Sequence, residues 1–574
     1  MAKTGKLELA WVGKDDRPRL EPRILIEDPD RSYHAEKRHS EGDIFDNMLI
    51  KGDNLLALKA LEQDYSGLVK CVYIDPPFNT GNAFEHYDDG VEHSIWLNLM
   101  RERLEILRRL LRKDGFLCAH IDDSEGHYLK VLLDEVFGRE NYQTTIYLQV
   151  RYPQKTLKQD MSYHKQVEMV HVYRNSFDAK PWLTPKASGL EKFNFYVSTE
   201  GEGKEIELGG KRTIVFEPGD YKIEKGEPSV DGRKEIWATG SILDGNSSGR
   251  FFRDYLDGRV SEDGLGALYK VYGIGDDKFD HRFFTGPKRA NATKGKYFQG
   301  VPTAKLENAD AGTQPIENFL DLAGAFGNCR HEGGVEFRSG KKPEVLLQKI
   351  LTHFSNENDL VLDSFAGSGT TAAVAHKMNR KWITVEIGEH CETHVIPRLT
   401  GIIDGTDLTG ATENLGWGGG GGFRYYTLAP SLIETDRFGM SIISKEYNAA
   451  MLAEAMCKHM GFTYAPSETD YWNHGFSTET DFIYVTTQSL THDTLRKISA
   501  DVGDGRTLLV CCKAYSGGEN LDNLTIHKIP SIVLDKCEWG RDDYSLNVAN
   551  LPMAEDEDPD ADLPLFAEGG SDDE

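Results

Sequence analysis

Residues 360–388, LVLDSFAGSGTTAAVAHKMNRKWITVEIG, predict a strand, a glycine loop, a helix and a second strand. The first apolar run ends in Asp363, and the second ends in Glu386, 19 residues after Gly367. Glycines let the backbone approach a ligand closely, and the free N–H groups of a helix N-terminus attract anionic groups. An acid that ends the second strand can accept hydrogen bonds from ribose hydroxyls. The stretch therefore predicts an α/β unit that binds a nucleotide-like ligand.

By itself, the glycine loop is only moderately specific. Gly367-x-Gly369-x-x-Ala372 also satisfies the dinucleotide fingerprint. A glycine turn in a purely structural unit, and a nicotinamide or flavin enzyme, both stay open at this point. A second motif is needed to decide among them.

That second motif is YIDPPFNTG, residues 73–81, which follows the apolar run that begins at Cys71. An exocyclic amine of a base is a poor nucleophile because its lone pair is delocalised into the ring. It improves when acceptors hold both hydrogens, here the Asp75 carboxylate and the Pro76 carbonyl, which the double proline orients. Phe78 can stack on the base. Alone, the four residues DPPF could equally form a surface turn. Paired with the glycine loop, they indicate a site for a planar amine at the carboxyl ends of strands.

Strand and helix patterns alternate around both motifs. Strands are expected at 70–75, 116–122 and 166–174. Residues 93–115 have apolar positions spaced for a helix, with Gly115 as its stop, and residues 125–138 predict another helix that ends at Gly138. This alternation predicts a mostly parallel α/β sheet.

Together, DPPFNTG and DSFAGSGTT resemble the catalytic and cofactor motifs of amino-group DNA methyltransferases, which use S-adenosylmethionine. The catalytic motif comes first, an order that resembles the beta class. Residues 96–138, 295–302 and 416–428 are similar to modification subunits of type III restriction–modification systems. The resemblance covers residues 47–428. It implies a Rossmann-like α/β methyltransferase domain with an inserted target-recognition domain and a small C-terminal α/β domain.

The resemblance assigns a role to each matching residue. The catalytic residues are Asp75, Pro76, Pro77 and Phe78. The cofactor-binding residues are Asp53, Lys342, Pro343, Asp363, Phe365, Ala366, Gly367, Ser368, Gly369, Thr370 and Glu386. Glu386 matches the ribose-binding acid, and Lys342 with Pro343 matches the segment at the methionine end. Asp53 either approaches the cofactor adenine or caps the following helix.

The target base is expected to be adenine, methylated on N6 after it flips out of the duplex. Asp75 resembles adenine-N6 enzymes, whereas cytosine-N4 enzymes, the alternative, more often carry Ser. Phe78 stands where Tyr is commoner and keeps the stacking surface. An RNA or protein-glutamine methyltransferase is disfavoured by the motif order, and an inactive specificity subunit by the intact motifs. No metal is expected, and no covalent intermediate, since none of the 21 prolines precedes a cysteine.

The net charge of −27 is unevenly distributed. Residues 401–574 carry −19, whereas residues 151–350 carry +2, so the overall charge does not exclude a DNA-binding protein. DNA contacts are expected in the insertion, where cations alternate with aromatic residues. The candidates are Arg282, Lys288, Arg289, Lys294 and Lys296. The alternative for this stretch is a solvated loop on an aromatic core.

We predict seven segments. They are an N-terminal arm (1–46), the catalytic half of the methyltransferase domain (47–175), the target-recognition insertion (176–335), the cofactor half (336–400), a glycine-rich junction (401–424), a C-terminal α/β domain (425–552) and an acidic disordered tail (553–574).

The expected partners are double-stranded DNA and, from the resemblance, a second copy in a homodimer. No GxxxxGK[ST] motif occurs, so a restriction system would need a separate helicase and nuclease subunit. Residues 562–566, DLPLF, resemble the peptide that bacterial proteins insert into the sliding clamp, although chance or packing onto the domain would explain them too. No run is apolar enough for a membrane span or signal peptide, and no CxxC pair occurs. We expect a cytoplasmic prokaryotic protein.

Overall fold

The computed structural model describes residues 8–78, 89–153, 163–184, 190–238, 247–289, 292, 294–303, 313–337, 340–517 and 521–545. The chain forms two compact units. The first comprises Met1–Trp182 and Glu317–Glu574, and the second comprises Leu183–Ile316. The second unit lies within the predicted insertion, 176–335.

The first unit is built on a ten-stranded mixed sheet. Its strands, in spatial order, are β1 (Leu25–His34), β18 (Gly422–Leu428), β2 (Asn47–Lys51), β17 (Lys381–Glu386), β16 (Leu360–Asp363), β3 (Val69–Ile74), β4 (Leu111–Ile121), β6 (Val167–Arg174), β5 (Tyr142–Gln149) and β15 (Phe319–Asp321). Strands β18 through β4 pair in parallel, whereas β1 and β6 pair antiparallel with their neighbours. The predicted α/β fold with a largely parallel sheet is confirmed.

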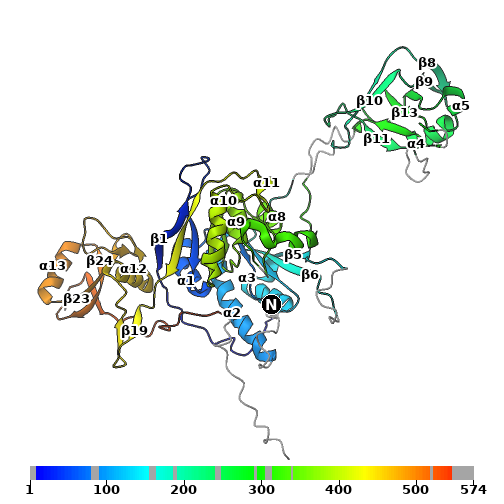
Figure 1. Ribbon diagram of the computed structural model, residues 1–574. Coiled ribbons are helices and arrows are strands. Elements are labelled where there is room, and N and C mark those ends of the chain that lie inside the picture. The colour runs from blue at the N-terminus through cyan, green and yellow to red at the C-terminus, as the bar shows by residue number, and fades with distance from the viewer. Residues whose placement is uncertain are drawn as a thin grey trace, which may run out of the picture. The chain divides into compact units, whose positions relative to one another are not determined.

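Helices pack against this sheet in two groups (Figure 1). The first group is α1 (Asn54–Tyr65), α2 (Asp89–Leu110) and α3 (Gly126–Phe137), and the second is α8 (Glu344–Phe354), α9 (Thr370–Lys377) and α10 (Ile396–Ile403). Strand β3, VKCVYI, is buried along its whole length, as expected for a strand that is covered on both faces. The two sequence motifs follow β3 and β16, which are direct neighbours. The sheet therefore places both motifs at one edge.

Helix α2 does not end where the sequence predicts. It ends at Leu110, and Gly115 lies inside β4 rather than at a helix stop. The pairing of β3 with β4 shifts register between Val69 and Cys71, so β4 carries extra residues there. A Cβ at Gly115 would come within 3.0 Å of the carbonyl oxygens of Arg112 and Val69. The glycine is required by this close approach of two strands. At α3 the prediction is confirmed, because Gly138 (φ 89°) caps its end.

The N-terminal arm and the glycine-rich junction are both part of the sheet. Figure 1 shows blue β1 beside yellow β18, which joins residues from the arm to residues just beyond the junction. Residues 419–423 are buried, and the N–H of Gly422 donates to the carbonyl of Ile44. A Cβ at Gly421 (φ 76°) would lie 2.7 Å from the same carbonyl. These glycines therefore permit tight backbone packing and do not form a separate linker.

The second unit is antiparallel β structure. A six-stranded sheet has the order β11 (Lys234–Trp237), β14 (Lys296–Gln299), β13 (His281–Thr285), β12 (Leu268–Tyr272), β9 (Lys211–Phe216) and β8 (Lys204–Leu208). A two-stranded sheet pairs β10 (Tyr221–Lys225) with β7 (Phe195–Thr199). Short helices α4 (Ser247–Phe251) and α5 (Val260–Asp263) complete the described part. The mostly β character expected from the sequence is confirmed.

After β18 the chain forms a small α/β region. Its sheet has the order β21 (Thr463–Tyr464), β22 (Gly475–Phe476), β23 (Asp481–Leu490), β24 (Thr507–Tyr515) and β25 (Leu524–Lys528), accompanied by α12 (Ala449–Met460) and α13 (His492–Val502). Among the described helices, none combines the length and the apolarity of a membrane-spanning segment. The predicted tail 553–574 and the motif 562–566 lie outside the described residues.

Candidate active site

The double-proline corner is anchored directly after β3. The Nε1–H of Trp96, on α2, donates to the carbonyl of Pro77 at 2.8 Å. Trp96 is fully buried, so this bond ties the corner to the protein core. Phe78 is half-buried, and the Nζ of Lys342 lies 4.6 Å from its ring centroid. The corner is therefore held rigidly, with its aromatic ring beside a cation.

The glycine loop is organised by Asp363 at the end of β16. One carboxylate oxygen accepts the N–H of Phe365 at 2.9 Å, and the other accepts the hydroxyl of Thr371 at 2.5 Å. Burial raises the pKa of Asp363 to about 7, and the charges of Asp75 and Glu386 contribute in the same direction. Gly369 (φ 74°) begins α9 in the left-handed region. Asp363 thus fixes the loop from within and does not reach the surface.

Glu386, at the end of β17, faces the loop. Its Oε2 accepts the N–H of Gly367 at 2.7 Å, and its Oε1 accepts the N–H of Gly388 at 2.9 Å. His390 Nε2 lies 3.0 Å from Oε1, and this hydrogen bond raises the pKa of His390. A carboxylate offers about four lone-pair directions. Glu386 therefore keeps acceptor capacity for ligand hydroxyls.

Both motifs open onto one cavity of about 420 Å³. Of the residues predicted from the sequence, its lining includes Asp53, Asp75, Pro76, Pro77, Phe78, Lys342, Phe365, Gly367 and Glu386. The remaining predicted residues are not in this lining: Pro343, Asp363, Ala366, Ser368, Gly369 and Thr370. They shape the loop from behind; for example, the hydroxyl of Thr370 donates to the carbonyl of Lys342 at 3.2 Å. The two motifs thus form the walls of a single site.

Asp75 is held on one side only. Its Oδ2 lies 2.9 Å from Lys342 Nζ. Its Oδ1 is buried and has no hydrogen-bond partner among the described residues. The resemblance predicts that Lys342 contacts the methionine end of a cofactor. In this structure its ammonium pairs with Asp75. An acceptor without a donor is costly to bury, and here it belongs to a residue that lines the cavity.

Of the two roles predicted for Asp53, the structure shows the helix cap. Its Oδ1 caps α1 by accepting the N–H groups of Leu55 and Leu56 at 2.9 and 3.1 Å. Its Oδ2 accepts the N–H of Tyr544 at 2.8 Å. Asp53 also lines the cavity. No sequence motif points to Tyr544, because this contact joins positions far apart in the chain.

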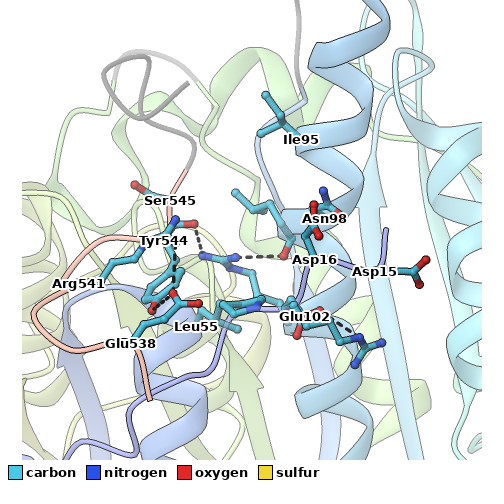
Figure 2. Close-up of a pocket in the computed structure, with 14 residues that line it drawn as sticks. Asp15, Asp16, Leu55, Ile95, Asn98, Glu102, Glu538, Arg541, Tyr544 and Ser545 are labelled. Atoms are coloured by element: carbon cyan, nitrogen blue, oxygen red, sulfur yellow. Dashed lines mark hydrogen bonds and ion pairs between the residues drawn. The ribbon is translucent and has the colours of Figure 1, made fainter. Parts of the chain in front are cut away.

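Residues 538–545 return from the C-terminal region to this edge of the site. The Nη2 of Arg103 donates to the carbonyl of Tyr544 at 3.1 Å, and Ser545 lines the cavity. A second cavity, about 560 Å³, adjoins the first and shares Leu99, Arg103 and Ser545 with it. Figure 2 shows Tyr544 and Ser545 across this second cavity from Ile95 and Asn98 of α2.

In the second unit, a separate cavity of about 710 Å³ gathers most of the predicted DNA contacts. Lys288, Arg289, Lys294 and Lys296 line it, together with Trp237, whose side chain is 58% exposed. Lys296 Nζ lies 2.8 Å from Glu235 Oε2 and 4.7 Å from the Trp237 ring centroid. Trp237 is an aromatic residue that the sequence reasoning missed, because it lies outside the basic stretch.

Arg282 does not belong with these cations. Its side chain is buried, 2.7 Å from Asp277 Oδ2 and 2.5 Å from Ser248 Oγ. Strand alternation turns this arginine inward, so the expectation that it contacts DNA is corrected. The interleaved aromatic residues are likewise core residues, namely Phe283, Phe284, Tyr297 and Phe298.

Comparisons with known proteins agree on one family. The family model described as DNA methylase matches residues 69–396. The chain is 31% identical over 464 residues to a protein of Haemophilus influenzae named as the probable type III restriction-modification enzyme HindVI Mod subunit, covering 76% of this chain and 61% of that protein. It is 27% identical to the type III restriction-modification enzyme EcoPI Mod subunit of Escherichia phage P1, covering 65% and 61%. The chain thus spans about three fifths of the length of these relatives.

Solved structures resemble the chain more distantly. The PvuII DNA methyltransferase (cytosine-N4-specific) aligns with 67% of this chain and 94% of its own, at 13% identity and a TM-score of 0.33. No conclusion about the target base follows from so low a score.

Proposed function

This chain belongs to the DNA methylase family, and from that premise we propose that it methylates N6 of adenine in double-stranded DNA, with S-adenosylmethionine as methyl donor. The observation that carries the proposal is Asp75 Oδ1, a buried acceptor without a hydrogen-bond partner among the described residues. It lies in the cavity that the glycine loop also lines. An amine that enters this cavity finds an acceptor already in place.

The cavity suits the proposed cofactor. At Gly367 (φ 52°) an added Cβ would meet nothing within 4 Å, so the loop faces open space at this point. Glu386 keeps acceptor capacity for ribose hydroxyls, and Asp53 lines the same cavity. When bound, S-adenosylmethionine supplies a methyl group activated by a positively charged sulfur. The carboxylates of Asp53 and Glu386 in the cavity lining favour a ligand of that charge.

The protein's own part in the reaction is to hold the amine. Asp75 Oδ1 accepts one N–H, the Pro76 carbonyl accepts the other, and Phe78 stacks on the ring. With both hydrogens held, the nitrogen lone pair is directed away from the ring plane. Asp75 would also take the proton that the amine loses when it receives the methyl group, and would pass that proton to water. Positioning of this kind accounts for most of the catalysis.

The substrate and system follow from the same premise. A buried acceptor reaches a base only after the base leaves the duplex. Lys288, Arg289, Lys294 and Lys296 gather on one cavity of the second unit, and we propose that they bind DNA phosphates. The relatives named as type III Mod subunits favour a cytoplasmic bacterial restriction–modification role. We propose that in this role it forms a homodimer and works with a separate helicase and nuclease subunit, and, as an independent proposal from the sequence alone, that residues 562–566 dock on a sliding clamp.

The test is Asp75→Asn, assayed by transfer of a tritiated methyl group to duplex DNA. The amide replaces an acceptor oxygen with a donor, so methyl transfer should fall at least about 10³-fold. Cofactor binding, measured by calorimetry, should stay within a few-fold. Asp46→Asn is the matched control, because Asp46 pairs with Lys381 on the surface.

Mass spectrometry of nucleosides from methylated DNA identifies the base. N6-methyladenine supports the proposal, whereas N4-methylcytosine would show that the target base is cytosine, the alternative. Near-wild-type methylation by Asp75→Asn would overturn the assignment of the amine site.

A further inference from the structure

Behind Asp75 lies a row of buried polar side chains that the proposed reaction does not yet use. Lys342, 7% exposed, contacts Asp75 and also lies 3.8 Å from Glu168 Oε2. Glu168 Oε2 in turn lies 2.7 Å from His120 Nε2. The hydroxyl of Tyr73 lies 2.7 Å from His120 Nδ1. The row therefore runs from the cavity into the fully buried interior.

The sheet topology explains how these residues meet. Tyr73 and His120 lie near the carboxyl ends of the parallel strands β3 and β4. Strand β6 runs antiparallel to β4, so Glu168, near the start of β6, reaches the same edge. Three strands thus deliver three polar side chains to one point. A fully buried histidine beside a largely buried glutamate is unusual enough to need a partner or a task.

Neighbouring charges and hydrogen bonds shift the pKa values of Lys342 and Glu168. Burial alone would lower the pKa of Lys342, but the charges of Asp75 and Glu168 outweigh burial and raise it. Burial alone would raise the pKa of Glu168, but the hydrogen bond and charge of His120, together with the charge of Lys342, lower it to about 2. At neutral pH the charged Lys342 ammonium therefore lies between the charged Glu168 carboxylate and Asp75.

We propose that Glu168, supported by His120 and Tyr73, is a positioning residue that fixes Lys342 so that it holds Asp75 Oδ2 and leaves Oδ1 to the substrate amine. The inference rests on the proposed function of Asp75. It goes further by giving roles to residues outside both sequence motifs.

The physical reason is the sharing of one positive charge. If Lys342 had Asp75 as its sole counter-ion, the ammonium could move toward the cavity and occupy both oxygens of Asp75. Glu168 draws the ammonium back, and His120 holds Glu168 in place. Asp75 then stays oriented and open on one side. The hydrogen bond to Tyr73 fixes which nitrogen of His120 faces Glu168.

Other charged groups also act on this cluster and enter any interpretation of pH dependence. Asp363 and Glu386 act on the same edge from β16 and β17. Cys329 acts on Lys342, and Arg151 acts on Glu168. All of these are retained in the variants below, so a shift between variants reports the substituted charge.

The test compares the acid limb of the kcat–pH profile in Lys342→Met and Glu168→Gln. Lys342→Met removes the cation that lies 2.9 Å from Asp75 Oδ2, so the cluster loses the charge that favours its anionic form and the limb should move up by about 1–3 pH units. Glu168→Gln removes an anion from the cluster, so the limb should move the opposite way, to lower pH. In both variants kcat should fall about 10–100-fold through misplacement, while the KM for DNA changes little.

Tyr73→Phe is a milder second variant that removes one oxygen. It should lower kcat a few-fold without changing the KM for DNA or the affinity for S-adenosylmethionine. Its matched control is Tyr173→Phe. Tyr173 is also fully buried, and its hydroxyl donates to Asp134 at 2.6 Å, on the opposite face of the sheet from Glu168 and His120. Tyr173→Phe should leave kcat unchanged.

The outcomes separate the two proposals. Suppose that the wild-type protein methylates DNA, but the acid limbs of Lys342→Met and Glu168→Gln stay at the wild-type pH or both move the same way. The positioning role is then overturned, and the proposed function stands. Equal loss of kcat in Tyr73→Phe and Tyr173→Phe also overturns it. If the wild-type protein transfers no methyl group to DNA, the proposed function fails and this inference fails with it. If Glu168→Gln does not fold, the two tyrosine variants and Lys342→Met decide.

Discussion

Two buried charge clusters flank the glycine loop, and they differ in whether every carboxylate oxygen that lines or faces them has a donor. The open cluster is Asp75, Lys342 and Glu168, in which Asp75 Oδ1 has no hydrogen-bond partner among the described residues. The closed cluster is Glu344, Lys377, Arg398 and Asp407, all fully buried or nearly so. Both contain a lysine between two carboxylates. Residue type alone therefore does not distinguish them.

In the closed cluster every carboxylate oxygen has a donor. Glu344 binds Arg398 at 2.7 Å through Oε1 and Lys377 at 2.8 Å through Oε2. Asp407 binds Lys377 at 2.6 Å and the N–H of Thr409 at 3.0 Å. Arg398 also donates to the carbonyl of Ser368 at 3.0 Å.

A buried charge cluster can stabilise the fold or bind a ligand, depending on whether all its acceptors have donors. A cluster with every acceptor satisfied holds α8, α9 and the loop together. A cluster that leaves one acceptor facing a cavity is prepared for a ligand. The following experiments test that distinction, beginning with the largest effect.

Lys377→Met breaks the closed cluster. It leaves two carboxylates buried without their shared cation, so the free energy of unfolding should fall by about 3–5 kcal/mol. Chemical denaturation followed by circular dichroism measures this loss. The matched control is Lys381→Met, which removes an exposed ion pair with Asp46 and should change stability by less than about 1 kcal/mol. Equal effects of the two substitutions would refute the structural role of the closed cluster.

Asp363 is an intermediate case, with both oxygens hydrogen-bonded but no ion pair among the described residues. Its pKa of about 7 lies above the ordinary value of 3.8, so the folded state binds an extra proton between these pH values. Stability should therefore fall as pH rises from about 4 to about 7, by roughly 2–4 kcal/mol. Denaturation of wild type and Asp363→Asn across this range isolates the effect. A pH-independent difference between them would contradict it.

Lys342→Met breaks the open cluster, and its effect on stability should be the smallest of the three. Asp75 lines a cavity, so it can recover hydration or take a proton when the cation is lost. We expect the free energy of unfolding to fall by about 1–2 kcal/mol, well below the loss in Lys377→Met. The same denaturation series measures both. A loss as large as that of Lys377→Met would mean that the open cluster is also structural.

Local patterns predicted the elements that local forces determine. The helix that ends at Gly138 is confirmed because a positive φ at its end needs a glycine. Gly115 was misread, because its role comes from a neighbouring strand and not from the helix before it. Arg282 was misplaced for a similar reason, since a charged side chain within a strand can face Asp277 in the interior. In each error the deciding partner was distant in sequence or on the hidden face of a sheet.

The amino-acid order was enough to predict the α/β fold and the two motifs, because hydrophobic periodicity and the restricted geometry of glycine and proline act over a few residues. It also led to the prediction that the motifs share a site, since parallel strands end at one edge. The packing of the strands was needed to show which oxygen of Asp75 has no hydrogen-bond partner among the described residues, and that Lys342, Glu168, His120 and Tyr73 lie behind it. Hydrogen bonding and burial depend on distances between strands that the chain order does not specify.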